Sequence, residues 1–99
     1  MSEKPLFIPL KREFFEAFER GEKTVEYRVL GPRWNAQTCR IGRPVVLSLG
    51  YGKARRLHGR VSWFGIDYSP QDRPGWVACY GAHTCKAACI GVKIESAPV

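Results

Sequence analysis

The spacing of hydrophobic residues changes soon after the N-terminus. Residues 5–9 form a short apolar run typical of a β-strand, whereas apolar positions within residues 11–20 recur at the spacing of an α-helix. The apolar face of this predicted helix carries Leu10, Phe14, Ala17 and Phe18, with Phe15 beside it. Gly21 follows, at a position where helices commonly end in a left-handed residue. The pattern predicts a strand, then a packing helix, then a sharp reversal of the chain.

Residues 24–30 alternate between apolar and polar side chains, which is typical of a strand with two different faces. One face carries Val25, Tyr27 and Val29, and the other carries Thr24, Glu26 and Arg28. Gly31 and Pro32 end the strand. The alternation places Glu26 and Arg28 side by side, just after the reversal.

Three later segments, residues 44–49, 56–66 and 87–95, also read as strands, and residues 76–80 as a short strand or a helical turn. Leu57, Val61 and Trp63 are expected to share the buried side of the long strand, in which Gly59 and Gly65 predict bends or bulges. Four or five strands around one main helix predict a single α+β domain over residues 1–99. The expected architecture is a small curved sheet closed into a barrel, with the helix covering one end.

Charge is distributed unevenly along the chain. The net charge is +7, and no Asp or Glu occurs between Tyr27 and Ile66. That span holds Arg28, Arg33, Arg40, Arg43, Lys53, Arg55, Arg56 and Arg60. A surface of one sign attracts polyanions, and aromatic residues beside basic loops, such as Trp34 and Trp76, suit the bases of single-stranded RNA. The alternative for the basic residues is a surface that only keeps the protein soluble. The alternative for the tryptophans is that they belong to the core.

Several functional classes are not expected from this sequence. It has no apolar run of the roughly 20 residues that span a bilayer, no signal-peptide pattern and no glycine-rich nucleotide motif, so we expect a cytoplasmic protein with no membrane contact and no cofactor. The four cysteines, Cys39, Cys79, Cys85 and Cys89, lack the paired spacing of a zinc knuckle, and no metal site is expected. His83 between Cys79 and Cys85 leaves a loop-borne metal site open. No pattern sets an oligomeric state.

Lys23 is the first candidate for chemistry, because a lysine at a partly buried turn can act as a base or a nucleophile. The alternative is a solvated lysine paired with Glu19 at i, i+4. Glu26 could accept a hydrogen bond from an amino group such as that of cytosine, and Arg28 could bind a phosphate or a base edge. Their alternative is an ion pair on a solvated sheet face. Thr24 offers a hydroxyl group to a ligand.

These residues resemble the signature of ASCH domains. The resemblance lies in Leu10, Phe14, Phe18, Gly21, Lys23, Thr24, Glu26 and Arg28, followed by the Gly42-Arg43-Pro44 turn and by residues 58–61 and 88–95, which match in pattern. It implies a PUA-like β-barrel with a cleft beside the turn at Lys23. The family is associated with RNA binding. Some members are small enzymes, either an amidohydrolase that acts on N4-acetylated cytidine or a ribonuclease.

The sequence departs from the amidohydrolase members at two points. Those enzymes have a threonine three residues after the lysine, where this chain has Glu26, whereas Thr24 follows the lysine directly. They also have a later glutamate, for which Asp67 or Asp72 would have to substitute.

Three hypotheses follow from the sequence. The first is a domain that binds RNA or a modified nucleobase, for which the expected contacts are Lys23, Glu26, Arg28, Trp34, Arg43, Lys53, Arg55, Arg56, Arg60 and Trp76. The second is a small enzyme in the same cleft, with Lys23, Thr24 and Glu26 as its catalytic residues. The third is a protein-interaction domain whose basic face meets an acidic partner.

Overall fold

The computed structural model describes residues 3–73, 75–80 and 86–96. Its elements in chain order are β1 (Leu6–Leu10), α1 (Arg12–Glu19), β2 (Val25–Val29), β3 (Pro44–Leu49), β4 (Arg56–Asp67), the 3-10 turn η1 (Pro70–Asp72), α2 (Trp76–Tyr80) and β5 (Ala87–Ser96). Each predicted strand is present, and the ambiguous segment 76–80 is helical. The α+β class is therefore confirmed.

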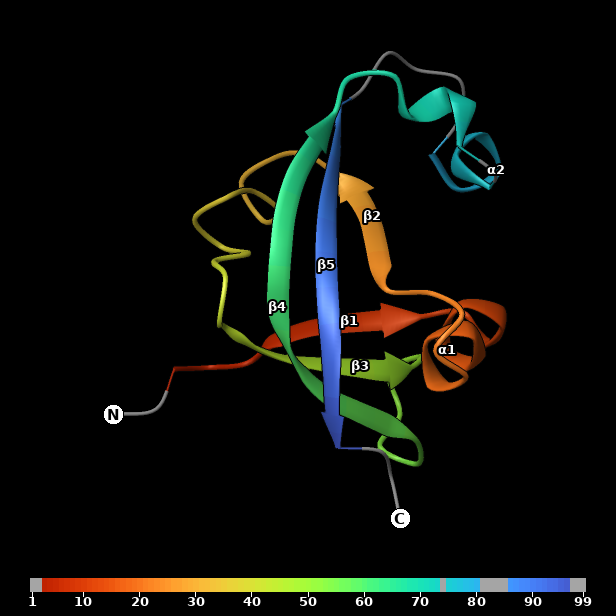
Figure 1. Cartoon of the computed structure of the whole chain (residues 1–99). Helices are drawn as coiled ribbons and strands as arrows, with labels where there is room; N and C mark the ends of the chain where they lie inside the picture. The colour runs from red at the N-terminus through yellow and green to blue at the C-terminus, as the bar shows by residue number, and fades with distance from the viewer. Residues whose placement is uncertain (1–2, 74, 81–85, 97–99) are drawn as a thin grey trace.

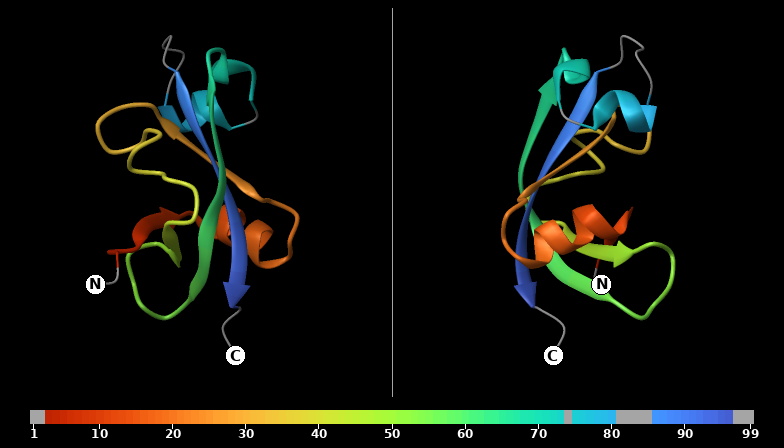
Figure 2. Two further views of the ribbon diagram at one scale, coloured as in Figure 1. Left: turned by 60° about the vertical axis from the view of Figure 1, so that its left-hand side comes forward. Right: turned by 90° about the vertical axis from the view of Figure 1, so that its right-hand side faces the viewer.

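The five strands form one sheet in the order β1-β3-β4-β5-β2. The pairing of β1 with β3 is parallel, and the other three pairings are antiparallel. Figures 1 and 2 show that the sheet curls strongly, so that β1 and β3 run across the lower part of β4 and β5. The result is a half-barrel with β1 and β2 as its edges, and α1 lies between these two edge strands in the chain.

The main core lies inside this curl. It contains Leu6, Ile8, Leu10, Phe15, Phe18, Cys39, Val45, Leu47, Leu57, Val61, Ile90 and Val92. In α1 the fully buried ring is Phe15, whereas Phe14 is only half-buried. Phe18 is buried as predicted and Phe14 packs against the core, so the predicted face is confirmed, with its centre nearer to Phe15 than to Phe14. Leu10 is buried as well, as a residue of β1.

A β-bulge in β4 reverses part of the predicted pattern. The register between β4 and β5 shifts between Val61 and Trp63. An extra residue in one strand turns all later side chains to the opposite face. Trp63 is consequently 52% exposed, and Phe64 packs against the core in its place. The prediction that Trp63 is a core residue was wrong for this reason.

A second, smaller core lies on the other face of the sheet. Trp76 of α2 packs there with Ala87 and Cys89 of β5, and the apolar side chains of β2 lie against them. The apolar face of β2 thus packs against a core, as predicted. Its polar face, which carries Glu26 and Arg28, turns toward the end of β1 and the start of α1. Within the described part of the chain, no helix is long and apolar enough to cross a membrane.

Gly59 permits a close approach of β4 to β5, and its replacement tests this packing. A Cβ atom at this position would lie 2.2 Å from the backbone carbonyl oxygen of Lys93, which cannot move independently of its strand. We expect Gly59→Ala to lower the free energy of unfolding by about 2–3 kcal/mol, measured by urea denaturation. Gly52→Ala is the matched control, because nothing lies within 4 Å of its added Cβ. Equal midpoints for the two variants would contradict this close packing.

Candidate functional site

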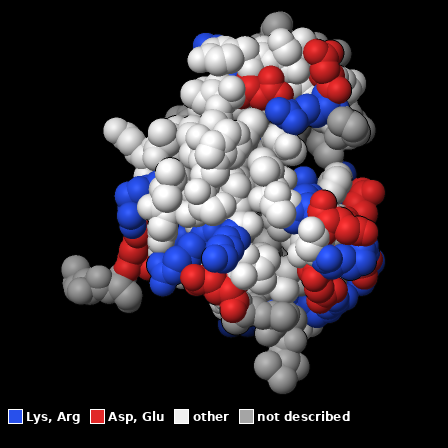
Figure 3. All heavy atoms as spheres, in the orientation of Figure 1, with Lys and Arg blue, Asp and Glu red and all other residues white. Residues whose placement is uncertain are grey.

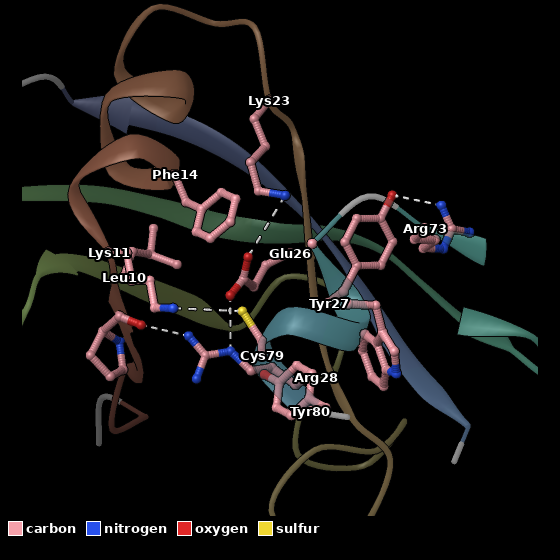
Figure 4. Close-up of a pocket in the computed structure, with 13 residues that line it drawn as sticks. Leu10, Lys11, Phe14, Lys23, Glu26, Tyr27, Arg28, Arg73, Cys79 and Tyr80 are labelled. Atoms are coloured by element: carbon pink, nitrogen blue, oxygen red, sulfur yellow. Dashed lines mark hydrogen bonds and ion pairs between the residues drawn. The ribbon is translucent and has the colours of Figure 1, made fainter. Parts of the chain in front are cut away.

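A cavity of about 530 Å³ opens beside the polar face of β2. Figure 4 shows its walls, which come from the end of β1, the start of α1, the strand β2 and the helix α2. It is lined by Pro9, Leu10, Lys11, Phe14, Lys23, Glu26, Tyr27, Arg28, Arg73, Gly75, Trp76, Cys79 and Tyr80. The volume is in the range of pockets that bind small ligands.

The turn after α1 positions the charged side chains of this pocket. Gly21 has a φ of 78°, so it adopts the left-handed conformation expected at the end of the helix. The backbone N–H groups of Glu22 and Lys23 both donate to the carbonyl oxygen of Ala17, which tightens the reversal. Lys23 therefore enters the pocket, and the alternation of β2 then places Glu26 and Arg28 on the same side.

Glu26 is a buried carboxylate held between two cations. It is 7% exposed. Arg28 Nε donates to its Oε2 at 2.9 Å, and Lys23 Nζ lies 3.8 Å from its Oε1. Burial raises the pKa of Glu26, while Arg28 and then Lys23 oppose that rise. The ion pair of the predicted alternative is therefore present, but it is buried and does not lie on a solvated face.

Lys23 is enclosed by aromatic rings. Its Nζ lies 4.9 Å from the ring centre of Tyr27, 5.5 Å from Phe14 and 5.6 Å from Phe18. The side chain is 19% exposed. Burial lowers the pKa of Lys23; Glu26 opposes this effect, and Arg73 reinforces it. The alternative pairing of Lys23 with Glu19 is wrong, because Glu19 pairs with Arg55 instead.

The mouth of the pocket carries further polar groups. Lys11 Nζ lies 3.8 Å from the thiol sulfur of Cys79. Burial raises the pKa of Tyr80, and the positive charge of Arg28 opposes this rise. Arg73 Nη1 donates to the hydroxyl oxygen of Tyr27 at 3.1 Å, which fixes the ring that faces Lys23. The pocket thus combines a buried carboxylate, several cations and four aromatic side chains.

Four of the candidate residues from the sequence meet in this pocket, namely Lys23, Glu26, Arg28 and Trp76. Trp76 is only 3% exposed, and its ring packs on Tyr80 with centres 4.4 Å apart. Thr24 is exposed and does not line the cavity. Neither Asp67 nor Asp72 lines it either, so neither supplies a second carboxylate there.

The basic residues between positions 33 and 60 lie outside the pocket, and many are engaged by the protein itself. Arg55 pairs with Glu16 and Glu19 of α1, and Arg60 lies 3.2 Å from Glu95. Arg43 donates to the carbonyl oxygens of Lys4 and Thr38. On the face drawn in Figure 3, blue and red groups accordingly lie next to one another around a broad uncharged area. On this face, the absence of acids within this sequence span therefore does not produce an uninterrupted basic surface.

Other candidates for RNA contact lie apart from the pocket as well. The guanidinium of Arg56 stacks over Phe7, with 5.4 Å to the ring centre, and Lys53 is exposed. Trp34 is half-buried against the main core, and the guanidinium carbons of Arg28 and Arg33 lie 5.1 Å and 5.3 Å from its ring centre. Within the described ranges, Arg56 and Lys53 have no acidic partner at ion-pair distance.

The sequence did not identify several residues that complete the pocket. The main ones are Lys11, Phe14, Tyr27, Arg73, Cys79 and Tyr80. Phe14 and Tyr27 were assigned to core faces by their periodicity. The residues from α2 had no local signal, because α2 packs against β2, which is distant from it in the sequence.

Of the residues named for a loop-borne metal site, Cys79 is described, and His83 and Cys85 lie outside the described residues. Among the described residues, no group of three His, Cys, Asp or Glu side chains is arranged to hold a metal ion. Cys39 and Cys89 are buried free thiols, and Cys79 lies at the pocket.

Comparison of the sequence with models of protein families found no matching family, and comparison with curated proteins found no significant match. Arguments about function therefore start from the pocket.

Proposed function

We propose that this pocket binds a nucleobase of the cytosine type, either in a modified nucleoside or in RNA. The observation that carries the proposal is the buried carboxylate of Glu26, which opens into a cavity walled by aromatic rings. A carboxylate oxygen accepts well from the exocyclic amino group of cytosine, and flat rings provide stacking surfaces for a base. The resemblance to ASCH domains, with a cleft at the same turn, supports the same proposal.

The cations complement this arrangement. Arg28 has one nitrogen on Glu26 and another on the carbonyl oxygen of Pro9 at 2.5 Å, so its plane is fixed at the pocket wall. A fixed guanidinium can donate to the carbonyl oxygen of a base. Many of the arginines at positions 33–60 are occupied by contacts within the protein, so we place recognition in the pocket first and on the outer surface second. The same contacts weaken the hypothesis of a broad basic face for an acidic protein partner.

A second candidate function is hydrolysis of an N4-acylated cytosine nucleoside, and the Lys23–Glu26 pair favours it. The neutral amine of Lys23 would take a proton from water, and the resulting hydroxide would add to the acyl carbon. The C–N bond then breaks, and Lys23 returns the proton to the departing amino group, which gives the nucleoside and the carboxylic acid. Glu26 would hold the N4–H during this sequence. The lowered pKa of Lys23 suits this role of general base.

An NMR titration tests the proposal. Labelled protein would be mixed with cytidine, N4-acetylcytidine, uridine and a short single-stranded RNA, and the same samples would be followed over time for acetate. We expect shifts at the backbone amides of residues 23–28 with the cytosine nucleosides and smaller shifts with uridine, which lacks the amino group. Release of acetate would support the hydrolase.

The amides of residues 50–54, in the loop between β3 and β4, serve as an internal control. A response confined to that loop and to Arg56 with RNA, with none at residues 23–28, would place recognition on the outer surface. No response to any cytosine ligand would overturn the proposed function.

A further inference from the structure

The pocket holds more positive charge than its own carboxylate can balance. Four cationic side chains line it, namely Lys11, Lys23, Arg28 and Arg73. Glu26 is the one acidic lining residue within the described ranges, and it already pairs with Lys23 and Arg28. Arg73 pairs with Asp67 outside the cavity at 2.5 Å. The charge that remains without an acidic partner in the described structure is that of Lys11.

Lys11 and Arg28 belong to the same corner of the pocket. Arg28 Nη2 is held at the carbonyl oxygen of Pro9, two residues before Lys11 in the chain. Lys11 Nζ points across the mouth to the thiol of Cys79 in α2, as Figure 4 shows. The third guanidinium nitrogen of Arg28, Nη1, has no hydrogen-bond partner among the described residues. Two positively charged donors therefore line the cavity beside the end of β1, and Lys11 is the more exposed of the two.

Such a corner suits a phosphate oxyanion. Phosphate oxygens accept charge-assisted hydrogen bonds from lysine and arginine, and a bound anion relieves the repulsion between two neighbouring cations. Tyr80 lines the same wall and offers a hydroxyl group. A flat base on the aromatic rings, with its amino group at Glu26, would direct the sugar and its phosphate toward the open mouth.

We propose that Lys11 and Arg28 form a phosphate subsite, so that the pocket selects a nucleotide over the corresponding nucleoside. This inference rests on the proposed function and adds the substrate class to it. Lys11 then determines the preference for nucleotides over nucleosides, because it contacts the phosphate and not the base. Phosphate as a monoester and phosphate within an RNA chain share this chemistry.

Calorimetric titration would measure the affinities of cytidine, cytidine 5′-monophosphate, cytidine 3′-monophosphate and an oligocytidylate. We expect at least one phosphorylated ligand to bind wild-type protein about tenfold more tightly than cytidine, with the advantage declining as salt is raised. Lys11→Ala should lower the affinity for that phosphorylated ligand about tenfold more than it lowers the affinity for cytidine. A monophosphate that binds best identifies a free nucleotide as the source, and an oligocytidylate that binds best identifies RNA.

Lys93→Ala is the matched control, because Lys93 is an exposed lysine on β5 outside the pocket. This variant should keep the full advantage of the phosphorylated ligands. Equal binding of cytidine and all its phosphorylated forms would overturn the phosphate subsite while the proposed function stands. An advantage that Lys11→Ala and Lys93→Ala reduce equally would overturn it too, since the effect would then be general attraction. Failure of every cytosine ligand to bind would remove both proposals.

Discussion

Arg28→Ala should destabilise the protein by about 3 kcal/mol at neutral pH, because the substitution strands a buried carboxylate. Arg28 is the strongest of the groups that oppose the rise in the pKa of Glu26. Its loss would leave Glu26 buried with Lys23 as the remaining cation at 3.8 Å, and it would leave the carbonyl oxygen of Pro9 without this donor. Urea denaturation of wild type and variant measures the effect.

The effect should depend on pH with a definite sign. Without Arg28, the pKa of Glu26 in the folded protein would lie still further above its ordinary value of 4.5. A folded state that holds its proton more tightly than the unfolded state is most stable below the unfolded pKa and loses stability as pH rises through the folded pKa. The loss in the free energy of unfolding that Arg28→Ala causes should therefore become smaller as the pH is lowered toward 4.5.

Two further variants distinguish destabilisation by the stranded charge from destabilisation by lost packing. Arg33→Ala is the matched control, because Arg33 stacks on the same Trp34 ring as Arg28 and is exposed, with no acidic partner in the described structure. It should cost less than about 0.5 kcal/mol. Adding Glu26→Gln to Arg28→Ala should restore part of the lost stability, since no charge remains to be stranded. A pH-independent loss that the second substitution does not change would contradict this account.

Periodicity predicted the strands well because their local pattern and their environment agree. The strand at 44–49 has the same bounds in the structure, and its alternating apolar residues Val45, Leu47 and Leu49 all pack in or against the main core. Trp63 shows where this reasoning fails. The bulge beside it depends on pairing with β5, about thirty residues later in the chain, and a single inserted residue reverses the face. A bend was predicted from Gly59 and Gly65, but the position of the bulge was not.

The candidate site could be predicted only in part for a similar reason. Lys23, Glu26 and Arg28 come together through one turn and one strand, so a local pattern was sufficient to group them. Arg55 was expected to be available to phosphates, yet it pairs with two glutamates of α1 that lie more than thirty residues earlier in the sequence. Long-range pairing of this kind leaves no trace in local spacing, and the contribution of α2 to the pocket has the same origin.

Lys23→Met should reduce turnover of an N4-acylated cytosine substrate by about 100- to 10,000-fold, the usual contribution of a general base. Methionine keeps the length of the side chain and its contact with Phe14 and Tyr27, so the fold should remain intact. Lys93→Met on the exposed side of β5 is the control and should leave turnover unchanged. A turnover that survives in Lys23→Met would assign the proton transfer to another group, and wild-type protein without turnover would exclude the hydrolase.

The pH dependence of the Lys23 amine gives a readout that does not require turnover. Burial lowers its pKa below the ordinary value of 10.5, so the neutral amine should form at a lower pH than in free lysine. NMR of the lysine side chains should show this titration directly, and wild-type turnover should rise over the same pH range. Glu26 raises the pKa of Lys23, so Glu26→Gln should move both transitions to still lower pH. Titration of Lys23 at the ordinary value of 10.5 would show that the pocket does not activate the amine, whatever the ligand.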